Sequence, residues 1–209
     1  MSEISATAVK ELREISGAGM MDCKKALAEA SGNLDMAMDI LRKSGIAKAQ
    51  KKSGRTTKEG MIYSYIHSGS KLGVLIEINC ETDFVAKTED FINLTKNLAM
   101  HIAASAPISV NREAITPDLL ERERDIYTDQ ARQSGKPDNI IDKMIEGRIN
   151  KYFQENVLLE QVFVKDPDKT VQDIITDTIA KLGENIVVSR FVRFQLGERT
   201  NNSSPPVDN

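Results

Sequence analysis

The sequence predicts an α+β fold: an N-terminal three-helix bundle, a linker, then a small antiparallel sheet with packed helices and an inserted helical hairpin. Three observations predict it. In several segments apolar residues recur every three or four positions, as on amphipathic helices. Three other segments are short, apolar and rich in residues that favour strands. The 209 residues are 40% hydrophobic and 28% charged, which is ordinary globular composition.

Residues 1–45 are expected to form the three-helix bundle. Ser5 and Asn33 are the expected N-caps of the first and third helices, Gly32 closes the second, and Gly45 ends the third. The apolar stripes comprise Val9, Leu12 and Ile15, then Cys23, Ala26, Leu27 and Ala30, then Ala37, Ile40 and Leu41. A unit of about 45 residues is near the lower size limit for independent folding, so we expect a docking module without an enzyme cleft.

Residues 46–58 are expected to be a basic linker, because Lys and Arg interleave with small residues and no apolar period survives. Residues 1–58 hold 11 Lys plus Arg against 7 Asp plus Glu, a formal charge of +4. The remaining 151 residues hold 17 against 24, a formal charge of −7, and the two parts add to the net charge of −3. A basic end suits an acidic partner. Solvated helices and linkers are also commonly basic without any such role.

Residues 59–115 and 157–197 are expected to form the α+β core. A hairpin is predicted from strands at residues 61–67 and 71–79, followed by a helix over residues 88–105 that Pro107 cannot continue. The buried face of that helix is expected to comprise Phe91, Leu94, Leu98 and Ile102.

The end of the core is expected to hold one more helix and one more strand. The helix spans residues 170–182 and ends at Gly183, and the strand spans residues 186–196. Alternation places Val188, Val192, Phe194 and Leu196 on one face of this strand. Residues 198–209, rich in Asn, Ser and Pro, are expected to be a disordered tail.

Residues 116–156 are expected to form a coiled-coil-like helical hairpin that projects from the core. Thr116 and Pro117 have the preferred order for an N-cap and the first helical position, and Gly135 and Pro137 mark the turn. The seam of the second helix is narrow and comprises Ile141, Met144 or Ile145, Ile149 and Tyr152. So narrow a seam indicates a two-helix projection without a second core.

The most informative motif is the end of the second predicted strand. An apolar run over residues 72–78 passes into the polar cluster Asn79, Cys80, Glu81, Thr82 and Asp83, followed by Phe84 and Val85. An acid and an aromatic ring therefore lie where a strand ends. From the residues alone, a Phe in this position is more often buried in its own core, with Asp83 acting as a turn or capping acid.

Three separated segments resemble the bacterial elongation factor Ts family, which exchanges the nucleotide of elongation factor Tu. They are the TDFV element at residues 82–85, GAGMMDCKKAL at residues 17–27 and SGKPDNIIDKMIEGR at residues 134–148, in the order of the family. The resemblance implies a ubiquitin-associated-like bundle at the N-terminus. It also implies no catalytic residue, no cofactor and no metal ligand of the chain's own.

The resemblance assigns contacts with elongation factor Tu to particular residues. Thr82, Asp83, Phe84 and Val85 match the projecting tip that enters the partner's G domain near its magnesium site. Arg13, Met20, Met21 and Lys24 match the family's contact surface on the bundle, although either Met taken singly could equally be buried. His67, in SYIHSG, and Val164, in FVKDPDKTV, are weaker assignments, because His67 could be merely exposed and some members differ beside Val164.

The chain also departs from the longer members of that family, which have two related halves in the core. This chain shows one strand-and-helix module, so a sheet edge is left that needs cover. Short members can associate as homodimers, and we expect a symmetric dimer that binds two molecules of elongation factor Tu.

Two other classes of protein stay open. One is an adaptor or RNA-associated protein that uses the bundle and the basic linker while Phe84 is buried. The other is a Cys-dependent enzyme built on Cys23 or Cys80 with His67 or His101, although none of these lies in a recognisable motif. GxxxxGK[ST] is absent near Gly17 and Gly19, so a phosphate-binding loop is not expected.

The cellular setting is expected to be the reducing cytoplasm. Two cysteines provide neither a disulfide framework nor a zinc spacing. No apolar run is long enough to span a membrane, and the first residues resemble neither a signal nor a transit peptide. Direct contact with nucleic acid is not expected.

Overall fold

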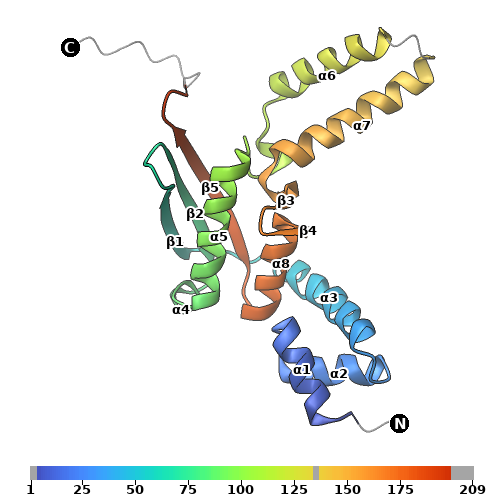
Figure 1. Ribbon diagram of the computed structural model, residues 1–209, viewed down its shortest axis with the longest axis vertical. Helices are drawn as coiled ribbons and strands as arrows, with labels where there is room; N and C mark the ends of the chain where they lie inside the picture. Colours follow the sequence, from blue (N-terminus) through green and yellow to red (C-terminus); the bar gives the residue numbers. More distant parts are fainter. Residues whose placement is uncertain (1–3, 134–136, 199–209) are drawn as a thin grey trace.

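The computed structural model describes residues 4–133 and 137–198, and its elements are arranged around a three-stranded sheet (Figure 1). In chain order they are α1 (Ala6–Ser16), α2 (Met20–Glu29), α3 (Leu34–Gln50), β1 (Glu59–Ile66), β2 (Leu72–Cys80), α4 (Asp83–Ala86), α5 (Glu89–Ser105), the 3-10 helix η1 (Arg112–Ala114), α6 (Pro117–Arg132), α7 (Asp138–Asn156), the 3-10 helix η2 (Leu158–Glu160), β3 (Val162–Phe163), β4 (Asp166–Thr170), α8 (Val171–Leu182) and β5 (Ile186–Gln195). The fold is therefore α+β, as predicted.

The sheet has the order β1-β2-β5 and is antiparallel throughout. The central strand β2 turns Val74, Ile76, Ile78 and Cys80 inward, and all four are buried against α5 and α8. The predicted apolar face of α5 is confirmed, since Phe91, Leu94, Leu98 and Ile102 are all buried. Thr88 accepts a hydrogen bond from the amide of Phe91 and caps this helix.

The predicted face of β5 was wrong, because a β-bulge reverses the alternation at Ser189. Arg190 pairs with Glu77 but Val188 pairs with Ile78, which leaves Ser189 as an extra residue. Val188 is buried, whereas the predicted members of the same face beyond the bulge, Val192, Phe194 and Leu196, are exposed. Phe191 instead turns inward and packs on the core.

The bundle has its own core of buried side chains contributed by α1, α2 and α3. Ser5 and Asn33 cap α1 and α3 as predicted, through hydrogen bonds from the amides of Ala8 and Met36. The prediction that the third helix ends at Gly45 was wrong, since α3 continues to Gln50 and residues 46–50 of the expected linker are helical. Ile15 is exposed, although the sequence placed it on the apolar stripe of the first helix.

The longer α3 is explained by its packing against α8. A Cβ built on Gly45 would lie 3.4 Å from the Cβ of Ala180, so Gly45 lets the two helices approach closely. Ala49, one turn later, is buried in the main core. Tertiary contact therefore overrides a local stop signal.

The hairpin of α6 and α7 projects from the end of the sheet opposite to α4 (Figure 1). Thr116 and Pro117 begin α6 as predicted, and the seam residues Ile141, Ile145 and Ile149 are buried in a third cluster. The expected turn residue Gly135 lies outside the described residues, and so do residues 199–209 of the expected tail.

Two further features complete the fold. Strands β3 and β4 form a separate antiparallel pair that the sequence did not predict. Helix α8 begins with a capping box between Thr170 and Asp173 and ends at Gly183, whose φ is +83°.

Across residues 4–133 and 137–198, none of the helices is long and apolar enough to cross a membrane.

Candidate functional site

The central strand β2 leads directly into the TDFV element, here called the tip and defined as residues 82–85. Thr82 has an extended backbone and caps the short helix α4, with its hydroxyl 3.5 Å from the amide nitrogen of Val85. Asp83, Phe84 and Val85 are the first three residues of α4. The tip is therefore one helical turn attached to the end of the most constrained strand of the sheet.

Within the tip, only one large side chain projects into solvent. Phe84 is 79% exposed, whereas Val85 is half-buried against the main core. The alternative prediction that Phe84 is buried in its own core was therefore wrong. A large apolar side chain held exposed at a fixed position gains free energy when a partner covers it.

The tip is anchored by Glu184, which follows the C-terminal cap of α8. Its Oε2 accepts the backbone N–H groups of Glu81 at 3.1 Å and Thr82 at 3.0 Å. Its Oε1 accepts the hydroxyl hydrogen of Thr82 at 2.6 Å. No motif in the sequence indicated Glu184, which lies 102 positions beyond Thr82.

Glu81 forms the reciprocal contact, because its side-chain carboxylate binds the backbone beside Glu184. We call this set of contacts between residues 81–82 and 184–185 the junction. Glu81 Oε1 accepts the backbone N–H of Asn185 at 2.7 Å, and this hydrogen bond lowers the pKa of Glu81, with Arg55 contributing. The side-chain amide of buried Asn185 donates through Nδ2 to the backbone carbonyls of Ser53 and Arg55. The end of β2, the start of β5 and the segment that leaves α3 are thus tied together.

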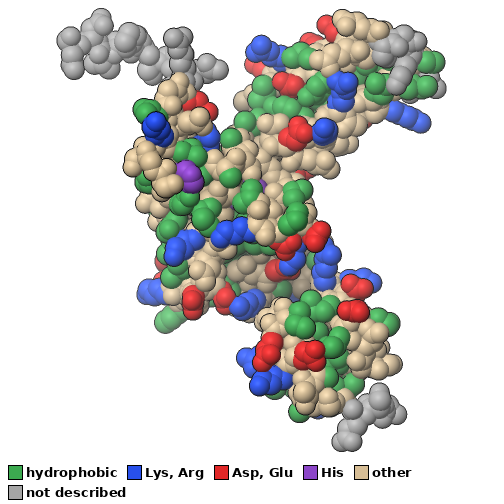
Figure 2. Space-filling model, in the orientation of Figure 1, with side chains coloured by type: hydrophobic (Ala, Val, Ile, Leu, Met, Phe, Trp, Pro, Cys, Tyr) green, Lys and Arg blue, Asp and Glu red, His purple; other side chains and the backbone are tan. Residues whose placement is uncertain are grey.

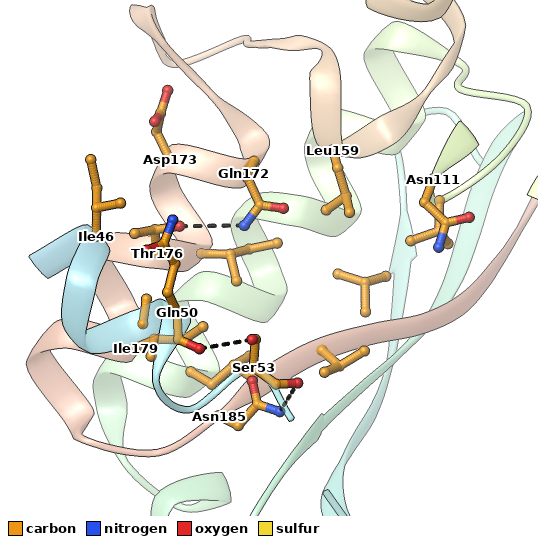
Figure 3. Close-up of a pocket in the computed structure, with 16 residues that line it drawn as sticks. Ile46, Gln50, Ser53, Asn111, Leu159, Gln172, Asp173, Thr176, Ile179 and Asn185 are labelled. Carbon is orange, nitrogen blue, oxygen red and sulfur yellow. Dashed lines mark hydrogen bonds between the residues drawn. The ribbon is translucent and has the colours of Figure 1, made fainter. Parts of the chain in front are cut away.

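A half-open hollow of about 460 Å³ lies beside this junction, between the end of α3, α8 and the start of β5 (Figure 3). Its wall is mostly apolar, with Ile46, Leu159 and Ile179 among the labelled side chains. The carboxylate of Asp173 at its edge is already used in capping α8. The hollow therefore has no converging reactive groups.

Asp83 is paired with Lys87 one turn later on the outer surface of the tip. Lys87 Nζ lies 2.6 Å from Asp83 Oδ2, and both side chains are at least half-exposed. The hydrogen bond from Lys87 lowers the pKa of Asp83. Asp83 is consequently an ionised carboxylate at neutral pH, beside the exposed ring.

The bundle residues singled out by the sequence lie around the turn between α1 and α2. Arg13 is in the last turn of α1, and Met20, Met21 and Lys24 are in the first turns of α2. All four are exposed, so neither Met is buried in the bundle, while Cys23 is. This surface combines two flexible apolar side chains with two cationic ones.

The two weaker candidates lie apart on the core. His67 is exposed after β1, and its Nδ1 is 2.9 Å from the hydroxyl oxygen of Tyr65. Val164 is half-exposed after β3, and its amide donates to Nδ1 of His101 at 3.3 Å.

Cys80 and His101, two of the candidates for a Cys-dependent enzyme, each have other hydrogen-bond partners; the Cys80 thiol donates to the carbonyl oxygen of Thr82 at 3.1 Å. The other ring nitrogen of buried His101 lies 2.9 Å from Gln161 Oε1, and burial lowers the pKa of this histidine. Burial, with the nearby charge of Glu184, raises the pKa of the Cys80 thiol to about 11. Among residues 4–133 and 137–198, no group of three or more His, Cys, Asp or Glu side chains could hold a metal ion.

The fold and the site together define an α+β protein with exposed apolar and charged side chains at the tip and on the bundle, and residues 4–133 and 137–198 bring no reactive groups together in the hollow. The family model "Elongation factor TS" matches residues 2–198. The chain belongs to the elongation factor Ts family.

Relatives named elongation factor Ts cover nearly the whole chain. Those of Geotalea daltonii and Thermoanaerobacter sp. (strain X514) are 58% and 57% identical over 195 and 201 residues, covering 93% and 96% of this chain and 90% and 98% of theirs. That of Fervidobacterium nodosum is 58% identical over 196 residues, covering 94% of this chain and 100% of its own.

The raised pKa of Cys80 predicts a poorly reactive thiol. At pH 8 we expect iodoacetamide to modify Cys80 about 100-fold more slowly in the folded protein than in urea, since a rise of two pKa units lowers the thiolate fraction by that factor. Mass spectrometry of peptides separates Cys80 from Cys23. Equal rates in the folded and unfolded protein would contradict the burial of this thiol.

Proposed function

We propose that this protein is a guanine nucleotide exchange factor for elongation factor Tu that promotes GDP release during translation elongation in the cytoplasm. It makes and breaks no covalent bond. The observation that carries the proposal is the exposure of Phe84 on an anchored tip, together with membership of the elongation factor Ts family. The absence of a paired nucleophile and base around Cys80 and His101 supports a binding role over a Cys-dependent enzyme.

Phe84 acts as a wedge on the partner's nucleotide site. A bound GDP is held by phosphate contacts and by Mg²⁺, which demands near-ideal octahedral geometry. Moving a loop that carries a metal ligand by about an ångström therefore weakens the site. Burial of an exposed aromatic side chain in the partner supplies the driving force, on the scale of interface hot spots at about 2 kcal/mol or more.

Asp83 contributes a negative charge next to the wedge. Its pKa is held below the usual range, so the carboxylate stays ionised at neutral pH. It competes electrostatically and by hydrogen bonding with the groups that order the metal ion. Thr82 and Val85 hold the geometry, the first as the cap of α4 and the second by packing on the core.

Exchange requires a preference for the empty partner. By linkage, a factor that weakens GDP binding by some ratio is itself weakened by GDP in the same ratio. The protein must therefore bind the nucleotide-free form of elongation factor Tu more tightly than the GDP form, since equal affinity for both would shift nothing.

The bundle is proposed to be a ubiquitin-associated-like docking module for the G domain of elongation factor Tu. Arg13, Met20, Met21 and Lys24 are its contact residues, and their shared exposure around one turn supports this. His67 and Val164 are proposed as minor contacts, since both are exposed or half-exposed on the core.

A second copy of the chain is proposed to cover the outer face of the sheet. On this face five apolar side chains are exposed across all three strands: Ile62, Ile66, Leu75, Val192 and Phe194. Gly73 lies between Ile66 and Phe194 in register, and a Cβ built on it would lie 2.9 Å from Cδ1 of Ile66, so the Ile66 side chain covers this glycine. A contiguous apolar patch of this kind is self-complementary in a two-fold dimer.

An RNA-associated adaptor is the competing function. It needs a buried Phe84, which the structure contradicts, and a basic surface. On the face shown in Figure 2, basic and acidic side chains are interspersed over the bundle and the adjoining core. Salt-dependent RNA binding without any effect on nucleotide release would favour the adaptor over the exchange factor.

The wedge is tested by Phe84→Ala. Release of fluorescent GDP from elongation factor Tu should slow by about thirtyfold or more at saturating factor, because the hot-spot burial is lost. Circular dichroism should be unchanged, since the ring makes little contact with its own core. The matched control is Ile108→Ala, a half-exposed apolar side chain outside every proposed contact; an unchanged release rate for Phe84→Ala refutes the wedge.

The docking surface is tested by the double variant Met20→Ala and Met21→Ala. Both side chains are exposed, so the bundle should stay folded. The factor concentration that gives half-maximal GDP release should rise about tenfold or more, while the maximal rate changes little, because docking binds both nucleotide states alike. A lower maximal rate at an unchanged half-maximal concentration would show that these residues act in release and not in docking.

The dimer is tested by Phe194→Lys, which places a charge on the apolar patch. Sedimentation velocity should give the mass of two chains for the unmodified protein and of one chain for the variant, since burying an unpaired charge opposes association. Ile108→Lys, off the sheet, should remain dimeric. A single-chain mass for the unmodified protein at every concentration would rule out the dimer.

A further inference from the structure

We infer that Glu184 is a positioning residue for the exchange reaction, acting through the tip to hold Phe84 in the conformation that enters the partner. The inference rests on the exchange function proposed above. Nothing in the chain's sequence motifs points to Glu184, and its hydrogen bonds go to Glu81 and Thr82. What assigns the role is its hydrogen bonding to the tip backbone.

The tip cannot hold its own conformation. Helix α4 has only four residues, and the backbone hydrogen bonds that close it, from Ala86 to Thr82 and from Lys87 to Phe84, are both long at 3.3 Å. A single helical turn of this kind fixes several backbone dihedrals for few hydrogen bonds. The salt bridge between Asp83 and Lys87 is exposed, and such pairs stabilise little. The position of Phe84 must therefore be set by contacts from outside the tip.

After Phe84, the packing of Val85 and buried Ala86 on the main core supplies such contacts. Glu184 supplies them at the residue where the tip begins. One carboxylate oxygen accepts two successive backbone N–H groups, those of Glu81 and Thr82. The other accepts the hydroxyl hydrogen of Thr82 at 2.6 Å, which leaves the lone pairs of that hydroxyl for the amide of Val85. A single side chain thus fixes both the backbone before Phe84 and the cap of its helix.

The carboxylate is itself held by rigid elements. Gly183, with φ of +83°, ends α8 and turns the chain, and Asn185 is buried and bound to the segment that leaves α3. Glu184 therefore lies between a helix end and the first residue of β5. The tip receives its orientation from α8 and the sheet.

The chain provides a matched control at the other end of the same helix. The carboxylate of Asp173 also accepts a backbone N–H and a threonine hydroxyl, both from Thr170, at 3.0 and 2.8 Å. Asp173→Ala removes the same kind of hydrogen bonds from α8 without touching the tip. A general loss of stability should therefore affect Asp173→Ala and Glu184→Ala alike, whereas misplacement of Phe84 should affect only the latter.

The test measures GDP release from elongation factor Tu against factor concentration for Glu184→Ala, Asp173→Ala and Phe84→Ala. For Glu184→Ala the maximal rate should fall about tenfold at an unchanged half-maximal concentration, because the competent tip is populated less while the bundle still docks. A variant that is only partly folded would instead reach the same maximal rate of GDP release, at a higher total protein concentration. Asp173→Ala should show at most such a rise in the half-maximal concentration, with its maximal rate unchanged.

Three further measurements keep the inference falsifiable. Hydrogen exchange of the Glu81 and Thr82 amides in the free protein should accelerate in Glu184→Ala and not in Asp173→Ala. Glu184→Gln keeps the shape and one acceptor oxygen, so it should fold and lose about threefold in maximal rate. In the Phe84→Ala background, Glu184→Ala should cause little further loss, because it acts through the ring.

The outcomes separate this inference from the proposed function. A full maximal rate for both Glu184 variants, with Phe84→Ala defective, overturns the positioning role and leaves the wedge intact. A full rate for Phe84→Ala overturns the wedge and the positioning role together. Independent losses from Phe84→Ala and Glu184→Ala show that Glu184 does not act through the tip and also overturn the inference.

Discussion

The pairing of β2 on both sides is the constraint on which the rest of the structure depends. Its backbone is hydrogen-bonded to β1 and β5, and its inward side chains from Val74 to Cys80 are buried under α5 and α8. A register shift by one residue would turn those side chains to the outer face, so the position of Cys80 is fixed. The tip, which begins two residues after Cys80, therefore starts from a defined point.

Much of the fold could be predicted because its signals are local. The caps at Ser5 and Asn33 and the buried face of α5 each depend on residues within a few positions of one another. The end of α3 could not be predicted, since packing of Gly45 on α8 overrides the stop signal of that glycine. The face of β5 could not either, because one extra residue at Ser189 reverses the alternation without any mark in the composition.

The site divides in the same way between local and distant determinants. The motif showed that Phe84 follows a strand, but its exposure depends on where the chain goes next, and the residues alone favoured burial. Glu184 was missed because it lies 102 positions from Thr82. The structure shows why: antiparallel pairing of β2 with β5 brings Cys80 opposite Ile186, which places the acid after Gly183 beside the tip, and the sequence did not predict that register.

An anchored wedge has an energetic advantage over a flexible one. An exposed Phe side chain forgoes about 1.5–3 kcal/mol of burial free energy, which becomes available when a partner covers it. A flexible tip would lose part of that gain in ordering its backbone and side chains, at about 1–2 kcal/mol for each residue's backbone. The hydrogen bonds between Glu184 and Thr82 order the backbone of the tip when the protein folds, so that entropy is already lost before a partner binds. Under the proposed exchange function, more of the burial free energy then remains to oppose GDP binding by elongation factor Tu, and by linkage the affinity of that partner for GDP falls by the same amount.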